Sequence, residues 1–265
     1  MAPRVNNQIR TAAPGTDSAR LEAYYTQPEL WDLERFEGSA DQRLRARLIA
    51  AMVDPQAETV LDVGCGNGFV TRRLRARRLV VGLDPSAEAL ACWDGVRVLA
   101  SGARLPFPDR SFDTVVSCEV LEHLPDGLFE QVTAELARVA RRSLVIGVPY
   151  RQDLRQGMTR CADCGEVYHV DLHRRSFRGP EDVLRAFPGF RLEVVGLHGP
   201  PQRNPLPAVS VDTIPPLGTR RAVGLRPLPR LRLRPNPHLP RRKRKTPPPL
   251  APGRPGVADE EGKFL

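Results

Sequence analysis

The sequence predicts a doubly wound α/β fold, in which helices cover both faces of a mostly parallel sheet. Two observations support this. Short apolar runs alternate with helical patterns, and a glycine-rich turn at 64–68 joins the first run to the next helix. Nearly continuous apolar strands are typical of parallel sheets that are covered on both sides. In such sheets ligands bind beyond the carboxyl ends of the strands.

The expected elements follow one another through the first 200 residues. A helical pattern over 21–53 comes first, because Leu44, Leu48 and Met52 recur at the spacing that buries one helix face. Strands are expected over 59–63, 79–84, 96–100, 112–117, 143–148 and 190–197, and helices over 69–78, 86–92, 126–141 and 180–187. Ser86 can cap the helix expected over 86–92. Residues 208–214 are a candidate for one more short strand. The last strands of such a sheet are otherwise not evident, so the prediction allows for their loss.

Composition divides the chain into a domain and two flexible ends. Residues 201–265 hold 14 lysines and arginines against 4 acidic residues, and 16 of the 27 prolines lie from Pro200 onward. That segment has little apolar surface to offset its ordering entropy. We therefore expect a flexible N-terminus over 1–20, a domain over 21–199 and a disordered tail over 200–265.

The charge distribution bears on the partners of the protein. The whole formal charge of +9 comes from the tail, so the domain is close to neutral. A neutral surface argues against a large nucleic acid as substrate of the domain. No stretch approaches the ~20 apolar residues of a membrane span, and the first 20 residues are too polar for a signal peptide. Five cysteines without such a signal indicate reduced thiols or metal ligands. We expect a cytoplasmic protein.

The turn at 64–68 has the spacing of a nucleoside-binding loop. Its glycines are Gly64, Gly66 and Gly68, which let the backbone approach a ligand closely. Dinucleotide-binding turns place the third glycine one position later, where this chain has Phe69. Asp84, which ends the second strand, can accept hydrogen bonds from two ribose hydroxyls. A nucleoside ligand is therefore expected, and a nicotinamide dinucleotide fits less well.

Three ordered motifs resemble class I S-adenosylmethionine-dependent methyltransferases of the small-molecule type. Residues 60–68, VLDVGCGNG, are similar to the first motif of that family. Residues 105–113, LPFPDRSFD, resemble the stretch before its fourth strand, and 120–124, VLEHL, the segment that follows. The resemblance covers about residues 20–150 and implies a Rossmann-like fold with S-adenosyl-L-methionine as cofactor.

The resemblance also implies positions that hold the cofactor. Asp62 and the backbone of Gly64 and Gly66 would hold its methionine end, and Asp84 its ribose. Ser101 stands where family members often have an aspartate for the adenine, so affinity for the cofactor is expected to be weaker. Tyr24, Tyr25 and Trp31 match an aromatic helix that covers the cofactor, although ordinary packing explains them equally well. The full set of expected cofactor-binding residues is Tyr24, Asp62, Gly64, Cys65, Gly66, Gly68, Asp84, Ser101, Gly102 and Ala103.

Methyl transfer needs in-line positioning and, for a hydroxyl or ammonium acceptor, a base. Glu119, Glu122 and His123 follow the fourth strand, at the sheet edge where the methyl group would lie. They are the candidate catalytic residues, with His123 titrating in the useful range. The alternative is that Glu122 and His123 only fix the loop.

A polar insertion over 151–178 contains a possible zinc site. Cys161, Cys164, His169 and His173 have the spacing C-x2-C-x4-H-x3-H, which resembles a zinc knuckle. Four ligands would close the site, so a zinc ion there would be structural. A free-thiol loop with surface histidines remains the alternative. The other cysteines, Cys65, Cys92 and Cys118, are expected to be small buried residues.

The sequence therefore predicts a methyltransferase for a small metabolite or glycan-type precursor. Two alternatives stay open: a non-catalytic cofactor-binding or interaction protein with a degenerate methyltransferase fold, and, less favoured, an NAD-linked oxidoreductase. The basic run 241–245 could contact polyanions through phosphates, but it lacks aromatic residues to read bases. The acceptor itself cannot be read from the sequence.

Overall fold

The computed structural model describes residues 24–160, 165–198 and 228–235. The expected flexible N-terminus at 1–20, the candidate strand at 208–214 and the basic run at 241–245 lie outside these residues. Within them, no helix is both long enough and apolar enough to cross a bilayer.

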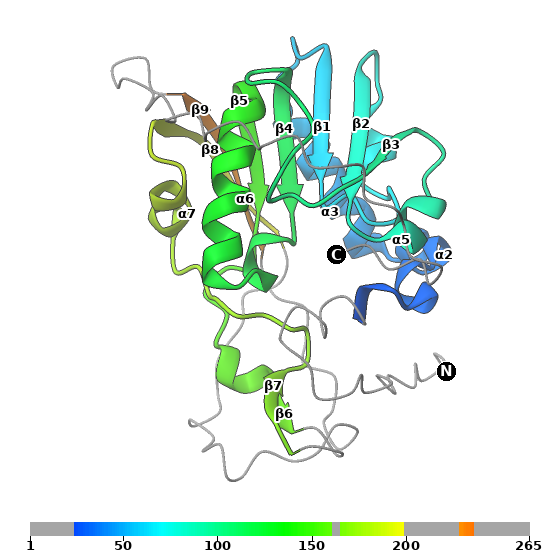
Figure 1. Ribbon diagram of the computed structural model, residues 1–265, viewed down its shortest axis with the longest axis vertical. Helices are drawn as coiled ribbons and strands as arrows, with labels where there is room; N and C mark the ends of the chain where they lie inside the picture. Colours follow the sequence, from blue (N-terminus) through cyan, green and yellow to red (C-terminus); the bar gives the residue numbers. More distant parts are fainter. Residues whose placement is uncertain (1–23, 161–164, 199–227, 236–265) are drawn as a thin grey trace, which may run out of the picture.

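A seven-stranded sheet forms the centre of the molecule (Figure 1). Its strands lie in the order β3-β2-β1-β4-β5-β9-β8. The strands are β1 (Thr59–Val63), β2 (Leu79–Asp84), β3 (Val96–Leu99), β4 (Phe112–Cys118), β5 (Ala140–Gly147), β8 (Phe190–His198) and β9 (Leu228–Pro235). The strands β1 to β5 pair in parallel, and β9 runs antiparallel to both of its neighbours. The predicted doubly wound, mostly parallel α/β fold is confirmed.

Helices cover both faces of the sheet (Figure 1). They are η1 (Pro28–Trp31), α2 (Leu33–Gly38), α3 (Ala40–Met52), α4 (Thr71–Leu74), α5 (Ala87–Ala91), η2 (Leu121–His123), α6 (Asp126–Val139), η3 (Leu154–Gly157) and α7 (Pro180–Ala186). Residues of α6 and α7 share one apolar cluster with Leu61 and Val115, and residues of α3 and α4 share another with Val60 and Val116. Consecutive strand residues thus enter opposite layers, because side chains alternate along a strand.

Two helical predictions were too long. The pattern over 21–53 is broken into η1, α2 and α3, because Asp32 and Ser39 take non-helical backbone angles and cap the next helix with their side chains. The helix expected over 69–78 is only the single turn of α4. The Ser86 cap of α5 is confirmed, since its hydroxyl accepts the N–H of Ala89 at 3.1 Å.

The prediction of a wholly disordered tail was wrong for residues 228–235, and the sheet does not lack its last strands. These residues form β9 between β5 and β8. Leu233 is fully buried in the core, whereas its neighbours Arg232 and Arg234 both pair with Glu193 of β8. Alternation of leucine and arginine is a strand pattern with one face toward the core. The proline and arginine content of the whole tail had hidden it.

The insertion over 151–178 lies beyond the carboxyl ends of the central strands (Figure 1). It contains η3 and a small antiparallel sheet of β6 (Met158–Arg160) and β7 (Val167–His169). An isolated bridge between Tyr150 and Phe177 closes its base. The insertion therefore stands at the edge where a ligand of this fold is expected.

Candidate active site

The turn after β1 has the backbone of a ligand-binding loop. Gly64, Gly66 and Gly68 all take positive φ angles, of 77°, 53° and 73°. Side chains rarely adopt this region, so glycine is required at these positions. The N–H groups of Gly64 and Cys65 both donate to the carbonyl oxygen of Leu83, at 2.8 and 3.1 Å. These bonds tie the loop to the end of β2.

The three glycines also make room for neighbouring side chains. A Cβ atom at Gly64 would collide with Val120, one at Gly66 with the Trp31 ring, and one at Gly68 with the Trp93 ring. Trp93 is fully buried, so it fills the space behind the loop. Trp31 lies on the loop from the side of the N-terminal segment.

Asp84 joins the loop to the next helix. Its Oδ2 accepts the N–H of Gly66 at 2.8 Å, and its Oδ1 accepts the N–H of Ser86 at 2.9 Å. Burial raises the pKa of Asp84, and these two backbone donors oppose the rise. Each carboxylate oxygen retains a second lone pair. Asp84 can thus hold the loop and still accept hydrogen bonds from a ribose.

Asp62 is buried one strand away, at the end of β1. Burial raises the pKa of Asp62 to about 7, and the charge of Asp84 adds to the rise. The hydroxyl of Thr71 donates to its Oδ2 at 2.7 Å and opposes the rise.

The cysteines differ in their burial. Cys65, directly after the strand, is buried, and burial raises the pKa of its thiol. The expectation of burial is confirmed for Cys65, but it was wrong for Cys92, which is exposed after α5, and for Cys118, which is half-buried at the end of β4.

The expected adenine side of the site follows β3. Ser101 is exposed, and its hydroxyl accepts the N–H of Ala103 at 3.2 Å, which closes a tight turn. A Cβ atom at Gly102 would lie 3.3 Å from Val63 Cγ1, so this turn packs against the end of β1. The N–H of Ala100 donates to the Asp84 carbonyl at 3.2 Å. Ser101, Gly102 and Ala103 therefore lie beside the Asp84 segment.

An aromatic group covers the glycine loop. The rings of Tyr25 and Trp31 are stacked with centroids 6.0 Å apart, and the indole N–H of Trp31 donates to the Tyr25 carbonyl at 2.9 Å. The Ser86 hydroxyl donates to the same carbonyl at 3.0 Å. Tyr24 stands edge-on to Tyr25 at 5.1 Å. Trp31 touches the loop, since a Cβ atom at Gly66 would lie 2.8 Å from its ring.

The candidate catalytic residues lie beyond β4. Glu119 has a positive φ of 58° and pairs with Arg45 at 3.7 Å. The Glu122 side chain is fully buried, with Oε1 3.9 Å from Nε2 of His123. Burial and the charge of Glu119 raise the pKa of Glu122 well above its ordinary value. Burial lowers the pKa of His123 to about 4.

The insertion brings two further histidines to this point. The His173 ring lies 4.8 Å from the His123 ring, and the His169 ring stacks on His173 at 5.0 Å. Gln152 lies between them, with Oε1 2.5 Å from Nδ1 of His173 and Nε2 3.1 Å from Nε2 of His169. The approach of His173 to His123 could not be read from the sequence, where 49 residues separate them.

The predicted zinc set is only partly visible, because Cys161 and Cys164 lie outside the described residues. Both nitrogens of His169 are engaged in hydrogen bonds. Its Nδ1 accepts the N–H of Asp171 at 3.1 Å, and its Nε2 lies 3.1 Å from the side-chain amide of Gln152. A Cβ atom at Gly157 would collide with the same Nε2. His169 is thus packed as a buried structural side chain.

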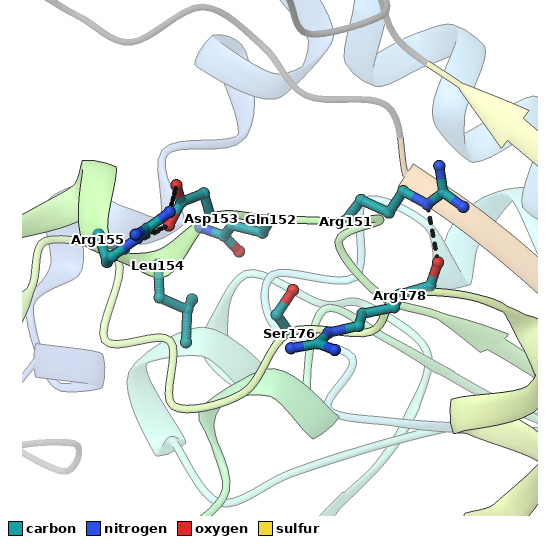
Figure 2. A pocket seen from close by; sticks show the side chains of 7 residues that line it. All are labelled: Arg151, Gln152, Asp153, Leu154, Arg155, Ser176 and Arg178. Carbon is teal, nitrogen blue, oxygen red and sulfur yellow. Dashed lines mark hydrogen bonds and ion pairs between the residues drawn. The ribbon is translucent and has the colours of Figure 1, made fainter. Parts of the chain in front are cut away.

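A surface hollow of about 410 Å³ adjoins the insertion. Its lining residues are Arg151, Gln152, Asp153, Leu154, Arg155, Ser176 and Arg178. Figure 2 shows Arg155 against Asp153, at 2.8 Å, and Arg151 beside the Arg178 carbonyl oxygen, to which its Nε donates at 3.0 Å. The hollow is separate from the glycine loop, and Gln152 is the lining residue that also contacts His173.

Comparison with known proteins supports the reading of the glycine loop. The family described as a methyltransferase domain matches residues 61–145, which run from β1 into β5. A comparison with curated proteins found no match. Among solved structures, the magnesium protoporphyrin IX methyltransferase of Synechocystis with bound S-adenosylhomocysteine is 16% identical, with a TM-score of 0.56 over 83% of this chain and 100% of that one.

A second solved structure is similar over nearly the same length. The 1,6-didemethyltoxoflavin-N1-methyltransferase of Burkholderia thailandensis is 17% identical, with a TM-score of 0.53 over 85% of this chain and 93% of that one. These structures share the fold, and the domain match covers the loop that carries Gly64, Gly66 and Gly68. Residues 61–145 therefore match a methyltransferase domain, and the chain has the α/β fold of these two methyltransferases.

Proposed function

We propose that the chain transfers the methyl group of S-adenosylmethionine to an oxygen, nitrogen or carbon atom of a small molecule. The single observation that carries the proposal is the loop of three left-handed glycines tied to a buried aspartate at the carboxyl edge of a parallel sheet. The two similar proteins are named as methyltransferases of magnesium protoporphyrin IX and of 1,6-didemethyltoxoflavin, which agrees with a small acceptor.

The proposed cofactor contacts follow the order of the strands. Asp62 and the loop backbone at Gly64 and Gly66 hold the methionine end, and Asp84 holds the ribose hydroxyls. The turn of Ser101, Gly102 and Ala103 receives the adenine, and the Ser101 hydroxyl can donate to a ring nitrogen while it accepts from the backbone. Tyr25 and Trp31 close the site from above, which excludes water from the sulfonium.

The proposed acceptor side lies between β4 and the insertion. Glu119, Glu122 and His123 are the candidates for taking a proton from a hydroxyl or ammonium acceptor. The sulfonium is already a strong electrophile, so positioning of the acceptor contributes most to the rate. A structural zinc ion at Cys161, Cys164, His169 and His173 stays a prediction, and the packing of His169 does not favour it.

The binding step is tested by calorimetric titration of the full chain with S-adenosylmethionine. We expect saturable binding in the wild type and its loss in Asp84→Ala. Asp94→Ala is the matched control, because it removes an exposed carboxylate that pairs with Arg75 and lies outside the proposed site. The control is expected to bind as the wild type does. No binding by folded wild-type protein would refute the proposal.

The two alternatives predict different results. An NAD-linked oxidoreductase would bind a nicotinamide cofactor, yet Phe69 is buried where the third glycine of a dinucleotide turn would stand. A non-catalytic binding protein would bind S-adenosylmethionine without releasing S-adenosylhomocysteine. An acceptor screen that follows S-adenosylhomocysteine release distinguishes it from an enzyme.

A further inference from the structure

Glu122, His123 and His173, here called the Glu-His-His cluster, meet at the acceptor side of the site. Two come from η2 after β4, and the third comes from the insertion. One carboxylate oxygen and one ring nitrogen from each histidine all lie within 4.8 Å of one another. The His123 ring also stands edge-on to Tyr25 at 5.9 Å, so the cluster borders the aromatic cover of the glycine loop.

The environment of Glu122 is the first observation that fits a cation ligand. Its side chain is fully buried, and both carboxylate oxygens are without a hydrogen-bond partner among the described residues. Arg45, the nearby guanidinium, pairs with Glu119. Burying a charged carboxylate without donors is costly, and buried charges are usually paired or bound to a metal.

Gln152 fixes the position of His173. Its side-chain amide lies 2.5 Å from Nδ1 of His173 and 3.1 Å from Nε2 of His169. Gln152 is itself buried, so this contact holds the His173 ring beside His123. A second residue that orients a ligand histidine in this way is a common feature of metal sites.

We propose that the Glu-His-His cluster binds one divalent transition-metal ion. Two imidazole nitrogens and one carboxylate oxygen are a donor set that zinc and related divalent ions use when coordination positions stay open. Ligand distances of about 2.0–2.2 Å require the three side chains to close slightly around the ion. An open position on the ion would hold the acceptor atom and lower its pKa. The role in methyl transfer rests on the proposed function, but the binding of metal does not.

Two other sets of ligands share His173 and predict different behaviour. His169, Asp171 and His173 also have ligand atoms within 4.8 Å of one another, but Asp171 is exposed and both nitrogens of His169 are already hydrogen-bonded. The set with Cys161 and Cys164 would use two thiolates. A test must therefore separate oxygen and nitrogen ligation from sulfur ligation.

The experiment is a cobalt titration of the full chain after treatment with a chelator. Absorption spectra follow the Co²⁺ d–d bands, without cofactor or acceptor. We expect one equivalent to bind without a thiolate charge-transfer band in the near ultraviolet. Glu122→Gln should weaken binding at least about tenfold. Asp171→Asn, a nearby carboxyl variant outside the cluster, should bind as the wild type does.

Several results would overturn the proposal. The proposal is wrong if folded wild-type protein shows no saturable binding of Co²⁺, if binding is unchanged in Glu122→Gln, or if binding is lost in Asp171→Asn. It is also wrong if a thiolate band appears and then disappears when Cys161 and Cys164 are changed to serine. If circular dichroism shows that Glu122→Gln is unfolded, His173→Gln supplies the same test from the insertion. The cobalt titration contains no S-adenosylmethionine. A failure to bind cobalt would therefore leave the proposed cofactor binding untouched, and a failure to bind S-adenosylmethionine would leave the proposed metal binding untouched.

Discussion

Asp113 shows how a buried carboxylate at the amino end of β4 holds three segments together. Its Oδ2 accepts the N–H groups of Glu58 and Thr59 at 3.0 and 3.1 Å, and its Oδ1 accepts from Arg141 at 2.9 and 2.6 Å. Burial alone would raise its pKa, but these donors and the Arg141 charge lower it overall. The carboxylate lies at the opposite end of the sheet from the cofactor loop, so its role is structural.

Asp113→Asn is therefore expected to destabilise the protein in a pH-dependent way. A folded-state pKa below the unfolded value of about 3.9 means that the stabilisation is present above that value and is lost as pH falls through the folded pKa. We expect a loss of about 1–3 kcal/mol at pH 7, measured by urea unfolding, and a smaller difference at pH 3. Asp109→Asn, at an exposed pair with Arg138, is the control and should cost under about 1 kcal/mol. A constant difference between Asp113→Asn and wild type at both pH values would contradict this account.

The position of Trp31 provides an optical signal for cofactor binding. The chain has two tryptophans, and Trp31 lies on Gly66 whereas Trp93 is buried behind Gly68. Addition of S-adenosylmethionine should change the emission of Trp31, because its ring lies against Gly66 of the proposed cofactor loop. Trp31→Phe should abolish the change in a fluorescence titration, and Trp93 supplies the internal control of constant emission. A signal that persists in Trp31→Phe would place the ligand elsewhere.

At the scale of elements, β9 determines whether the sheet is complete. It pairs with β5 on one side and β8 on the other. Its Arg234 bridges Glu193 of β8 and Asp54 after α3, at 2.7 and 3.0 Å. Without β9, both β5 and β8 would present unpaired edges, which natural proteins avoid.

Leu233→Ala is expected to cost about 2–5 kcal/mol of stability, because the side chain is fully buried in the cluster shared with α6 and α7. Thermal unfolding measures the loss. Leu197→Ala, at a leucine of β8 that is 58% exposed, is the matched control and should change stability by less than about 0.5 kcal/mol. Equal and small effects of both substitutions would show that β9 does not belong to the folded core.

At the scale of the whole molecule, burial decreases from the centre of the sheet to the β3 edge. Val60, Leu61, Val115 and Val116 of β1 and β4 are fully buried, whereas Val96 and Leu99 of β3 are 52% and 61% exposed. Amides protected by central strands open only when the protein unfolds globally. The protection of backbone amides from hydrogen exchange should therefore follow the order of the strands in the sheet rather than their order in the sequence.

Hydrogen exchange followed by mass spectrometry tests this pattern. We expect the slowest exchange in β1, β4 and β5 and the fastest strand exchange in β3. β9 should exchange nearly as slowly as β5, although it lies far along the chain in a proline-rich region. Rapid exchange in β9 beside slow exchange in β5 would contradict the observed strand order.

Local patterns allowed most of the fold to be predicted. The run at 59–63 and the glycines after it indicated β1 and its loop, because continuous apolar residues and positive φ angles have clear local signatures. β9 was missed because its alternation of arginine and leucine over 230–234 is short and lies within a segment rich in charge and proline. The meeting of His123 with His173 depends on how the insertion folds back over the sheet, which no spacing along the chain specifies.

The interior position of β9 has a consequence for synthesis of the protein. A nascent chain that has produced residues up to β8 cannot yet place that strand, because its neighbour in the sheet has not been made. β5 is then the open boundary of a partly built sheet for on the order of seconds, at elongation rates of roughly 5–20 residues per second. Protection of that boundary by chaperones would matter most in this interval, and ribosome pausing before residue 228 would prolong it.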